Sequence, residues 1–252
     1  MSFPNIIYAS AGNLEHRAND ASVNNRMMGQ RMEYDDGRKW RFVENGTTLL
    51  VPGDLVQGPA VVTGDYTDIA VDAAAAIGAT ALTFTATTTT AANVYGDPRG
   101  VGAFGTCHVN KGGLRAARVY RVKSNILFAA TAGITCVLED PLEVALAALD
   151  EIGFLKNPYT DVVEAPITTL TNRLVGVAQT AITGDYFGWL QTGGIAAVNS
   201  AASQIVGNRV EAVLAAAGRV GVSVTSIDQE VGIVLSVPTT AGEFGAVYLT
   251  MD

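Results

Sequence analysis

The chain has 252 residues, of which 48% are hydrophobic and 16% are charged. A charged fraction so far below the usual quarter argues against a disordered chain, and the length permits a real hydrophobic core. Acidic residues outnumber basic ones by 24 to 16 and the basic residues form no cluster, so we expect no direct binding of nucleic acid.

The first segment, residues 1–29, is expected to be an extended N-terminal arm. It is rich in Asn and has no sustained hydrophobic period, but an apolar cluster stands at its extreme end. The residues of this cluster are Phe3, Ile6, Ile7 and Tyr8. A disordered tail seldom carries such a cluster, so two interpretations are open. The cluster either anchors the arm on a neighbouring subunit or belongs to a first strand of the domain's own sheet.

The next segment has the composition of a β-hairpin. The sequence Asp-Asp-Gly at 35–37 separates 31–34 from 38–43, and Asp-Gly provides the positive φ that tight hairpin turns need. In the second of these strands Trp40 and Phe42 alternate with basic residues, which predicts one apolar face and one basic face.

Short runs of alternating or continuous apolar residues, separated by turn residues, continue to the end of the chain. The further strands that they predict are 49–56, interrupted by a Pro-Gly turn, then 80–85, 102–109, 117–123, 134–139, 174–179, 186–191, 195–199, 231–237 and 246–251. Strands this short, with a turn about every ten residues, indicate sandwich or barrel packing.

One short helix is expected at 141–151. The sequence Asp-Pro-Leu-Glu at 140–143 is typical of a capped helix start, and leucines at 142, 146 and 149 followed by Ile152 fall on one helical face. The Ala-rich stretch 200–221 fits either a helix or two strands separated by glycine.

These elements predict a mostly β protein made of β-sandwich or barrel-like modules, with an extended N-terminal arm and at most one or two short helices. We expect three parts: the arm at 1–29, a β-module that includes the hairpin at 30–155, and a C-terminal β-module at 156–252. The turn residues Gly153 and Pro158 place the break between the two modules.

No arrangement of residues predicts catalysis, a cofactor or a metal site. The sequence at 100–105 matches G-x-G-x-x-G, but a strand-like segment follows it, whereas a dinucleotide site needs a helix there. Of the two histidines, His16 lies in the expected arm and His108 in mid-strand, so neither suits a hydrolytic triad. Cys107 is adjacent to His108 rather than spaced from it as a zinc ligand, and with Cys136 it is expected to be a reduced, mostly buried thiol.

An acidic run extends from 139 to 164, with seven acidic residues against the single Lys156. It could bind a cation, but the spacing of an EF-hand is absent, so a solvated or subunit-facing acidic surface is the preferred interpretation. No stretch reaches the roughly 20 apolar residues of a membrane span, and the N-terminus lacks the features of a signal peptide. We expect no membrane partner.

From Gly58 onward a series of short motifs follows in a fixed order: IGAT at 77–80, ANVY at 92–95, YRVKS at 120–124, LEDPL at 138–142, KNPY at 156–159, VGVA at 175–178, YFGWLQTGG at 186–194 and a closing stretch at 233–249. This order resembles that of tailed-bacteriophage virion proteins of the capsid-decoration, or cement, type. The segment 99–119 departs from the family pattern.

The resemblance implies a non-enzymatic structural protein that stabilises the capsid exterior by binding the lattice of the major capsid protein. It implies assembly in the bacterial cytoplasm and self-association as a homotrimer at local three-fold positions of the capsid. Phe3, Ile6, Ile7 and Tyr8 would be the anchors of the arm. The alternative is a tail, fibre or head-fibre component whose β-module binds the host or a glycan.

Overall fold

The computed structural model describes residues 6–10, 15–65, 68–86, 88–97, 99–111, 116–129, 133–201, 204–213, 216–222 and 229–252. Over these residues the chain is almost entirely β and contains no helix of seven residues or more. The predicted class of β-rich modules is therefore confirmed.

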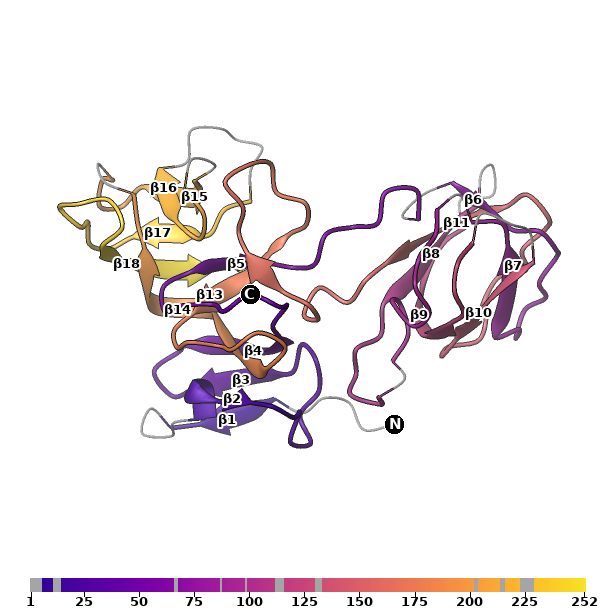
Figure 1. The fold of residues 1–252 in the computed structure, drawn as a ribbon, viewed down its shortest axis with the longest axis horizontal. Helices are drawn as coiled ribbons and strands as arrows, with labels where there is room; N and C mark the ends of the chain where they lie inside the picture. Colours follow the sequence, from indigo (N-terminus) through magenta and orange to yellow (C-terminus); the bar gives the residue numbers. More distant parts are fainter. Residues whose placement is uncertain are drawn as a thin grey trace. The chain divides into compact units, whose positions relative to one another are not determined.

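Apart from one 3-10 turn, η1 (Glu15–Arg17), every named element is a strand (Figure 1). The strands are β1 (Ile7–Ala9), β2 (Asn19–Asp20), β3 (Arg31–Tyr34), β4 (Lys39–Glu44), β5 (Leu55–Gln57), β6 (Ile69–Ala70), β7 (Ala81–Phe84), β8 (Thr106–Lys111), β9 (Ala116–Asn125), β10 (Ile134–Leu138), β11 (Glu151–Leu155), β12 (Val163–Glu164), β13 (Leu174–Ala178), β14 (Phe187–Asn199), β15 (Arg209–Ala212), β16 (Val220–Val222), β17 (Gly232–Val234) and β18 (Phe244–Thr250).

The chain forms two compact units, and the second is inserted into the first. Unit 1 comprises Met1–Pro59 and Pro158–Asp252, and unit 2 comprises Ala60–Asn157. The boundary near 157 lies close to the expected break at 155, but the expected module 30–155 is divided. Its first part belongs to unit 1 because β4 pairs with β14 and β5 pairs with β12 and β13. Such pairing between distant segments leaves no local sequence signal.

The sheet of unit 1 is organised around β14. The order along its main path is β1-β3-β4-β14-β18-β17-β15-β16, and β2, β5, β12 and β13 pair beside this path. The two strands expected at 186–191 and 195–199 are one strand, because the chain continues through a bulge between Gln191 and Gly193 rather than making a turn. Gly194 has a φ of 78°, which a residue with a side chain would rarely adopt.

The hairpin β3–β4 forms as predicted, with Gly37 at a φ of 84° in its turn. Trp40 and Phe42 are fully buried, whereas the basic residues between them are not. Phe42 packs on Trp189 of β14 with 5.1 Å between the ring centroids. The alternation of β4 therefore places an aromatic core on one face of the sheet.

The described part of 1–29 belongs to this sheet rather than to an extended arm. β1 pairs in parallel with β3, with Ile7 opposite Met32, and β2 pairs with β14. Of the two interpretations of the N-terminal cluster, the structure shows the first strand of the domain's own sheet. The physical reason is that β3 would otherwise have an unpaired edge, whose N–H and C=O groups β1 satisfies.

Unit 2 is a six-stranded sheet in the order β6-β11-β8-β9-β10-β7, curled into a half-barrel. Its two ends approach each other where Val71 bridges Phe84. The rings of Phe84, Phe128 and Phe154 pack against one another in its core, with centroid separations of 5.0 to 5.3 Å.

The helix expected at 141–151 does not form. This segment instead runs antiparallel to 71–79, with backbone hydrogen bonds joining Leu146 to Ala75 and Leu142 to Ala79. Leu142 and Leu146 are therefore four residues apart because they pair with two residues, Ala79 and Ala75, that are also four apart on the opposite extended segment. Leu149, expected on the buried helical face, is exposed and has a φ of 71°.

In the stretch 200–221 the described residues form strands rather than a helix. β15 and β16 form an antiparallel pair, with Glu211 opposite Gly221. Val210 and Val220 are fully buried, so the pair contributes to the core of unit 1.

Candidate interaction surfaces

An uncharged row of large side chains lies on the outer face of the unit 1 sheet. Ile195 of β14 pairs with Tyr248 of β18, and Tyr248 pairs with Ile233 of β17. Residues paired directly across strands point to the same face. The side chains are 58%, 47% and 37% exposed respectively. Three adjacent strands thus present large apolar groups to the surface.

A second row of small residues lies beside the first. Ala197 pairs with Ala246. These two alanines line a shallow hollow, together with Ile195, Phe244 and Ser236. Phe244 is also 58% exposed. We name these residues together the apolar face, which consists of Ile195, Ala197, Ile233, Leu235, Phe244, Ala246 and Tyr248.

The apolar face exists because β14 and β18 are apolar on both sides. Val198, Val247 and Leu249 point inward and are buried, while their neighbours at Ile195 and Tyr248 point outward. Both strands were predicted from the sequence, but their exposed apolar face was not. The sequence did contain a signal for it. In a strand with one buried face, apolar and polar residues should alternate, and in β14 and β18 they do not.

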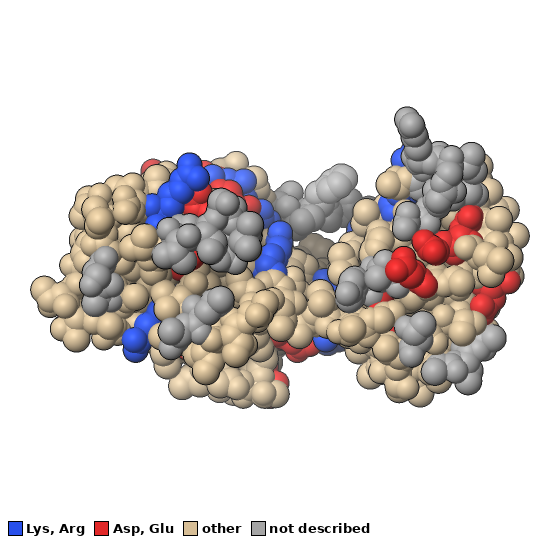
Figure 2. All heavy atoms as spheres, turned by 90° about the horizontal axis from the view of Figure 1, so that it is seen from above, with Lys and Arg blue, Asp and Glu red and all other residues tan. Residues whose placement is uncertain are grey.

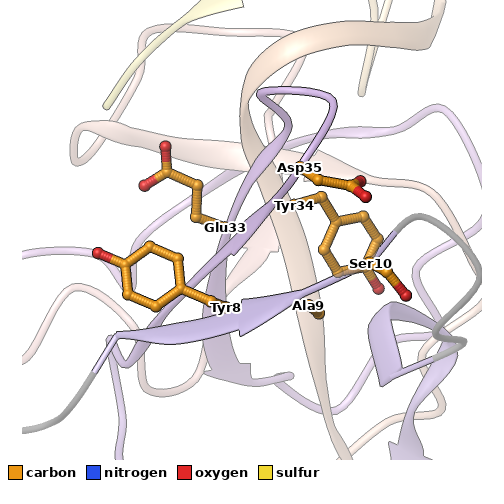
Figure 3. Close-up of a pocket in the computed structure, with 6 residues that line it drawn as sticks. All are labelled: Tyr8, Ala9, Ser10, Glu33, Tyr34 and Asp35. Atoms are coloured by element: carbon orange, nitrogen blue, oxygen red, sulfur yellow. The ribbon is translucent and has the colours of Figure 1, made fainter.

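Over the described residues β1 pairs with β3 alone, and its other edge is the second surface, an open edge of the sheet. Tyr8 of β1 is 77% exposed and stands opposite Glu33 of β3. Figure 3 shows the ring of Tyr8 and the side chain of Glu33 nearer the start of the β1–β3 pair, and Ser10, Tyr34 and Asp35 nearer its end. Together with Ala9 these residues line a shallow hollow. An edge strand of this kind offers backbone hydrogen-bonding groups to a partner strand.

The three predicted anchor residues that the structure describes have different surroundings. Phe3 lies outside the described residues. Ile6 is exposed just before β1, Ile7 is half-buried in β1 and Tyr8 points to the surface. The structure therefore brings Tyr8 together with Glu33, a contact that the sequence alone does not indicate, because it depends on the parallel pairing of β1 with β3.

Between these two surfaces the outer face of the sheet is polar and internally paired. Arg41 of β4 binds the Asp252 carboxylate at 2.6 Å and 2.9 Å, and the stem of Lys39 lies over Gly193. Burial alone would raise the pKa of Asp252, but the hydrogen bonds from Arg41 hold it below its usual value. The basic face predicted for β4 is thus neutralised by the C-terminal carboxylate side chain.

Three acidic residues of the run 139–164, all in unit 2, are paired with β9. Arg121 binds Asp140 at 2.7 Å, Arg118 binds Glu143 at 2.9 Å, and Lys123 lies 3.7 Å from Glu139. The hydrogen bond from Arg121 lowers the pKa of Asp140. The expected acidic surface is therefore balanced at these three positions. On the face drawn in Figure 2, charged side chains occupy small areas within a larger uncharged surface.

Two carboxylates lie close together inside unit 1. An ideal Cβ on Gly218 would be 3.0 Å from Asp54 Oδ1 and 2.6 Å from Glu164 Oε1. Burial raises the pKa of Asp54, although the Val51 N–H bond opposes this effect. Burial also raises the pKa of Glu164, and the charge of Asp54 adds to the shift. The described residues hold no group of three His, Cys, Asp or Glu side chains arranged to bind a metal ion.

The glycine-rich loop at 100–105 leads into β8, a strand, as expected. The backbone N–H groups of Val101 and Gly102 donate to the carboxylate of Asp97 at 3.0 Å and 2.6 Å. In a phosphate-binding loop such groups would face the phosphate. Here a side chain of the same chain occupies them, which fits a structural turn.

The cysteines and histidines are not assembled into one site. Cys107 and Cys136 are free thiols buried in unit 2, and burial raises the pKa of Cys136 to about 12. His16 lies in unit 1, where its Nδ1 is 2.8 Å from the hydroxyl of Tyr34, whereas His108 lies in unit 2. Within the described residues, no helix has the length and hydrophobicity needed to cross a lipid bilayer.

No protein-family model matches the sequence, and no curated protein is significantly similar to it.

Proposed function

We propose that this chain is a non-enzymatic structural protein of a tailed-bacteriophage virion. It decorates the capsid exterior and stabilises it by binding the lattice of the major capsid protein, after assembly in the cytoplasm of the bacterial host. Copies of the chain also associate with one another.

The observation that supports this proposal most is the open edge of unit 1 at β1. A strand edge with an exposed aromatic ring binds a partner by adding a strand, where the backbone provides affinity and the ring provides specificity. Tyr8 supplies that ring, and Glu33 stands beside it. Repeated contacts of this type over a lattice raise avidity without any single strong site.

Co-sedimentation with capsids that lack the protein tests the proposal. The wild-type chain should sediment with the capsids, and Tyr8→Ala should reduce occupancy by about tenfold or more, as expected for loss of an aromatic anchor. Leu149→Ala is the matched control, since Leu149 is also a large exposed apolar residue but lies in unit 2. A wild-type chain that never sediments with capsids would overturn the proposal, as would full occupancy by Tyr8→Ala.

One observation favours a second candidate, a tail or fibre module that binds a glycan. The exposed ring of Tyr8 has a carboxylate beside it at Glu33 and another in the same hollow at Asp35. Sugars stack on aromatic rings and donate hydroxyl hydrogen bonds to carboxylates. Binding to a glycan array that Tyr8→Ala abolishes, combined with antibody labelling of tails rather than heads, would favour this candidate.

A further inference from the structure

We infer that the apolar face of unit 1 binds a second copy of this chain in a two-fold, sheet-on-sheet contact. This inference rests on the self-association that is part of the proposed function. It uses a different surface from the β1 edge, so the two can be tested separately.

The first argument is that the apolar face carries both parts of a packing interface. Ile195, Tyr248 and Ile233 form a ridge across three strands, and the small side chains of Ala197 and Ala246 form a hollow beside it. When two such faces meet about a two-fold axis, the ridge of each copy enters the hollow of the other. A different partner would need to match only the ridge or only the hollow, whereas a second copy of the chain matches both.

The second argument is the distribution of charge at the ends of the face. The ridge continues from Ile233 to Arg209, which is paired with Glu230 at 3.4 Å. At the opposite side of the face, Arg41 is paired with the Asp252 carboxylate at 2.6 Å, and Lys39 donates to the backbone carbonyl of Asp252. Each end therefore carries groups of both signs. The two-fold axis that places each ridge in the other hollow runs parallel to the ridge and brings each end against the same end of the second copy. Arg209 of one copy can then approach Glu230 of the other, and no charge of the ridge interior is buried.

The third argument concerns packing and size. The opposite face of these strands is filled by Val198, Val247 and Leu249, so the outward side chains are held at fixed positions by a well-packed core. Two faces of twisted sheets pack at about 10 Å separation in this way. Three strands cover less than the roughly 800 Å² per partner of a standard interface. The pair should therefore dissociate on dilution and be favoured by the high local concentration on a lattice.

The geometry differs from the three-fold association that the family resemblance implies. Ridge and hollow lie on one face of one sheet, and a contact in which the same face meets itself has two-fold symmetry. The number of copies in the isolated assembly is consequently part of the test.

Sedimentation velocity over a range of concentrations measures this number directly. The wild-type chain should change from monomer to dimer as its concentration rises. Ile195→Glu should raise the dissociation constant of the dimer by about tenfold or more, because a charge would be buried against the partner ridge. Ile77→Glu is the matched control, since Ile77 is also an exposed isoleucine but lies in unit 2, so its replacement should leave the dimer unchanged.

A second variant, Ala197→Phe, distinguishes loss of the dimer from loss of folding. Ala197 is exposed, so the larger ring fits the monomer but fills the hollow. It should abolish the dimer while the circular dichroism spectrum stays that of the wild type. A wild-type monomer at all concentrations, a wild-type trimer, or an undisturbed dimer in Ala197→Phe would overturn the inference. Tyr8→Ala should remain dimeric, so loss of capsid binding and loss of the dimer are distinguishable.

Discussion

At the scale of single residues, the neighbouring carboxylates of Asp54 and Glu164 oppose the stability of unit 1. Both have raised pKa values, and both approach the backbone of Gly218. A raised pKa in the folded state means that folding favours the protonated form. The corresponding stability is fully present below the ordinary pKa values of 3.8 and 4.5 and is lost as the pH rises through the raised values.

Glu164→Gln should therefore stabilise unit 1 at neutral pH, because it removes a charge that folding disfavours. The midpoint of urea unfolding, followed by tryptophan fluorescence, should rise at about pH 7 and change little at about pH 4. Glu230→Gln is the control, since Glu230 belongs to an exposed ion pair whose loss costs about 0 to 1 kcal/mol. A lower midpoint for Glu164→Gln at neutral pH would contradict the argument.

At the scale of elements, one buried carboxylate fastens the connection between β7 and β8 to the core of unit 2. Asp65 is fully buried and accepts hydrogen bonds from the hydroxyls of Thr88, Thr90 and Tyr95, the last at 2.7 Å. Burial raises the pKa of Tyr95, and the hydrogen bond to Asp65 adds to the shift, so its hydroxyl remains a donor. Three donors from one connection therefore converge on one acceptor.

Thr90→Val should destabilise unit 2 by about 1.5 to 3 kcal/mol, because it removes a buried hydrogen bond to a charged group. Thr85→Val is the matched control. Thr85 makes an exposed hydrogen bond of 2.7 Å to Asp72, and its loss should cost within about 0.5 kcal/mol. Urea unfolding followed by far-ultraviolet circular dichroism gives both values. Equal costs for the two substitutions would show that the Asp65 network contributes nothing beyond an ordinary surface contact.

At the scale of the whole molecule, the chain leaves unit 1 for unit 2 and returns to the same place. An ideal Cβ on Gly58 would lie 3.0 Å from the carbonyl oxygen of Pro158, and Gln57 pairs with Val163. The two ends of the insertion are thus already joined by the sheet of unit 1. A domain inserted between adjacent ends places little constraint on the fold of its host.

Replacing 60–157 by a Gly-Ser dipeptide should consequently leave unit 1 folded. Both tryptophans, Trp40 and Trp189, are buried in unit 1, so their emission reports on this unit alone. The emission maximum and the urea midpoint should remain close to those of the full chain. Red-shifted emission from a chain without unit 2 would show that unit 1 depends on the insertion.

The sequence by itself determined the features that depend on neighbouring residues. The β class, the β3–β4 hairpin and the buried aromatic face of β4 followed from the period of two and from the Asp-Gly turn. Tyr8 was singled out because an apolar cluster in a polar segment is visible locally. The β class, the hairpin and the buried face of β4 held because φ, ψ and the alternation of side chains are properties of short segments.

Only the tertiary structure decided which segments meet. The insertion of unit 2, the place of β1 beside β3 and the pairing of 71–79 with 142–149 all join residues far apart in the chain. The leucines at 142 and 146 fit a helix equally well until this partner segment is known. Likewise, β14 and β18 are apolar on both sides, so only the folded sheet decides that Ile195 and Tyr248 face outward. The free energy of these choices comes from non-local pairing and burial, which no local pattern encodes.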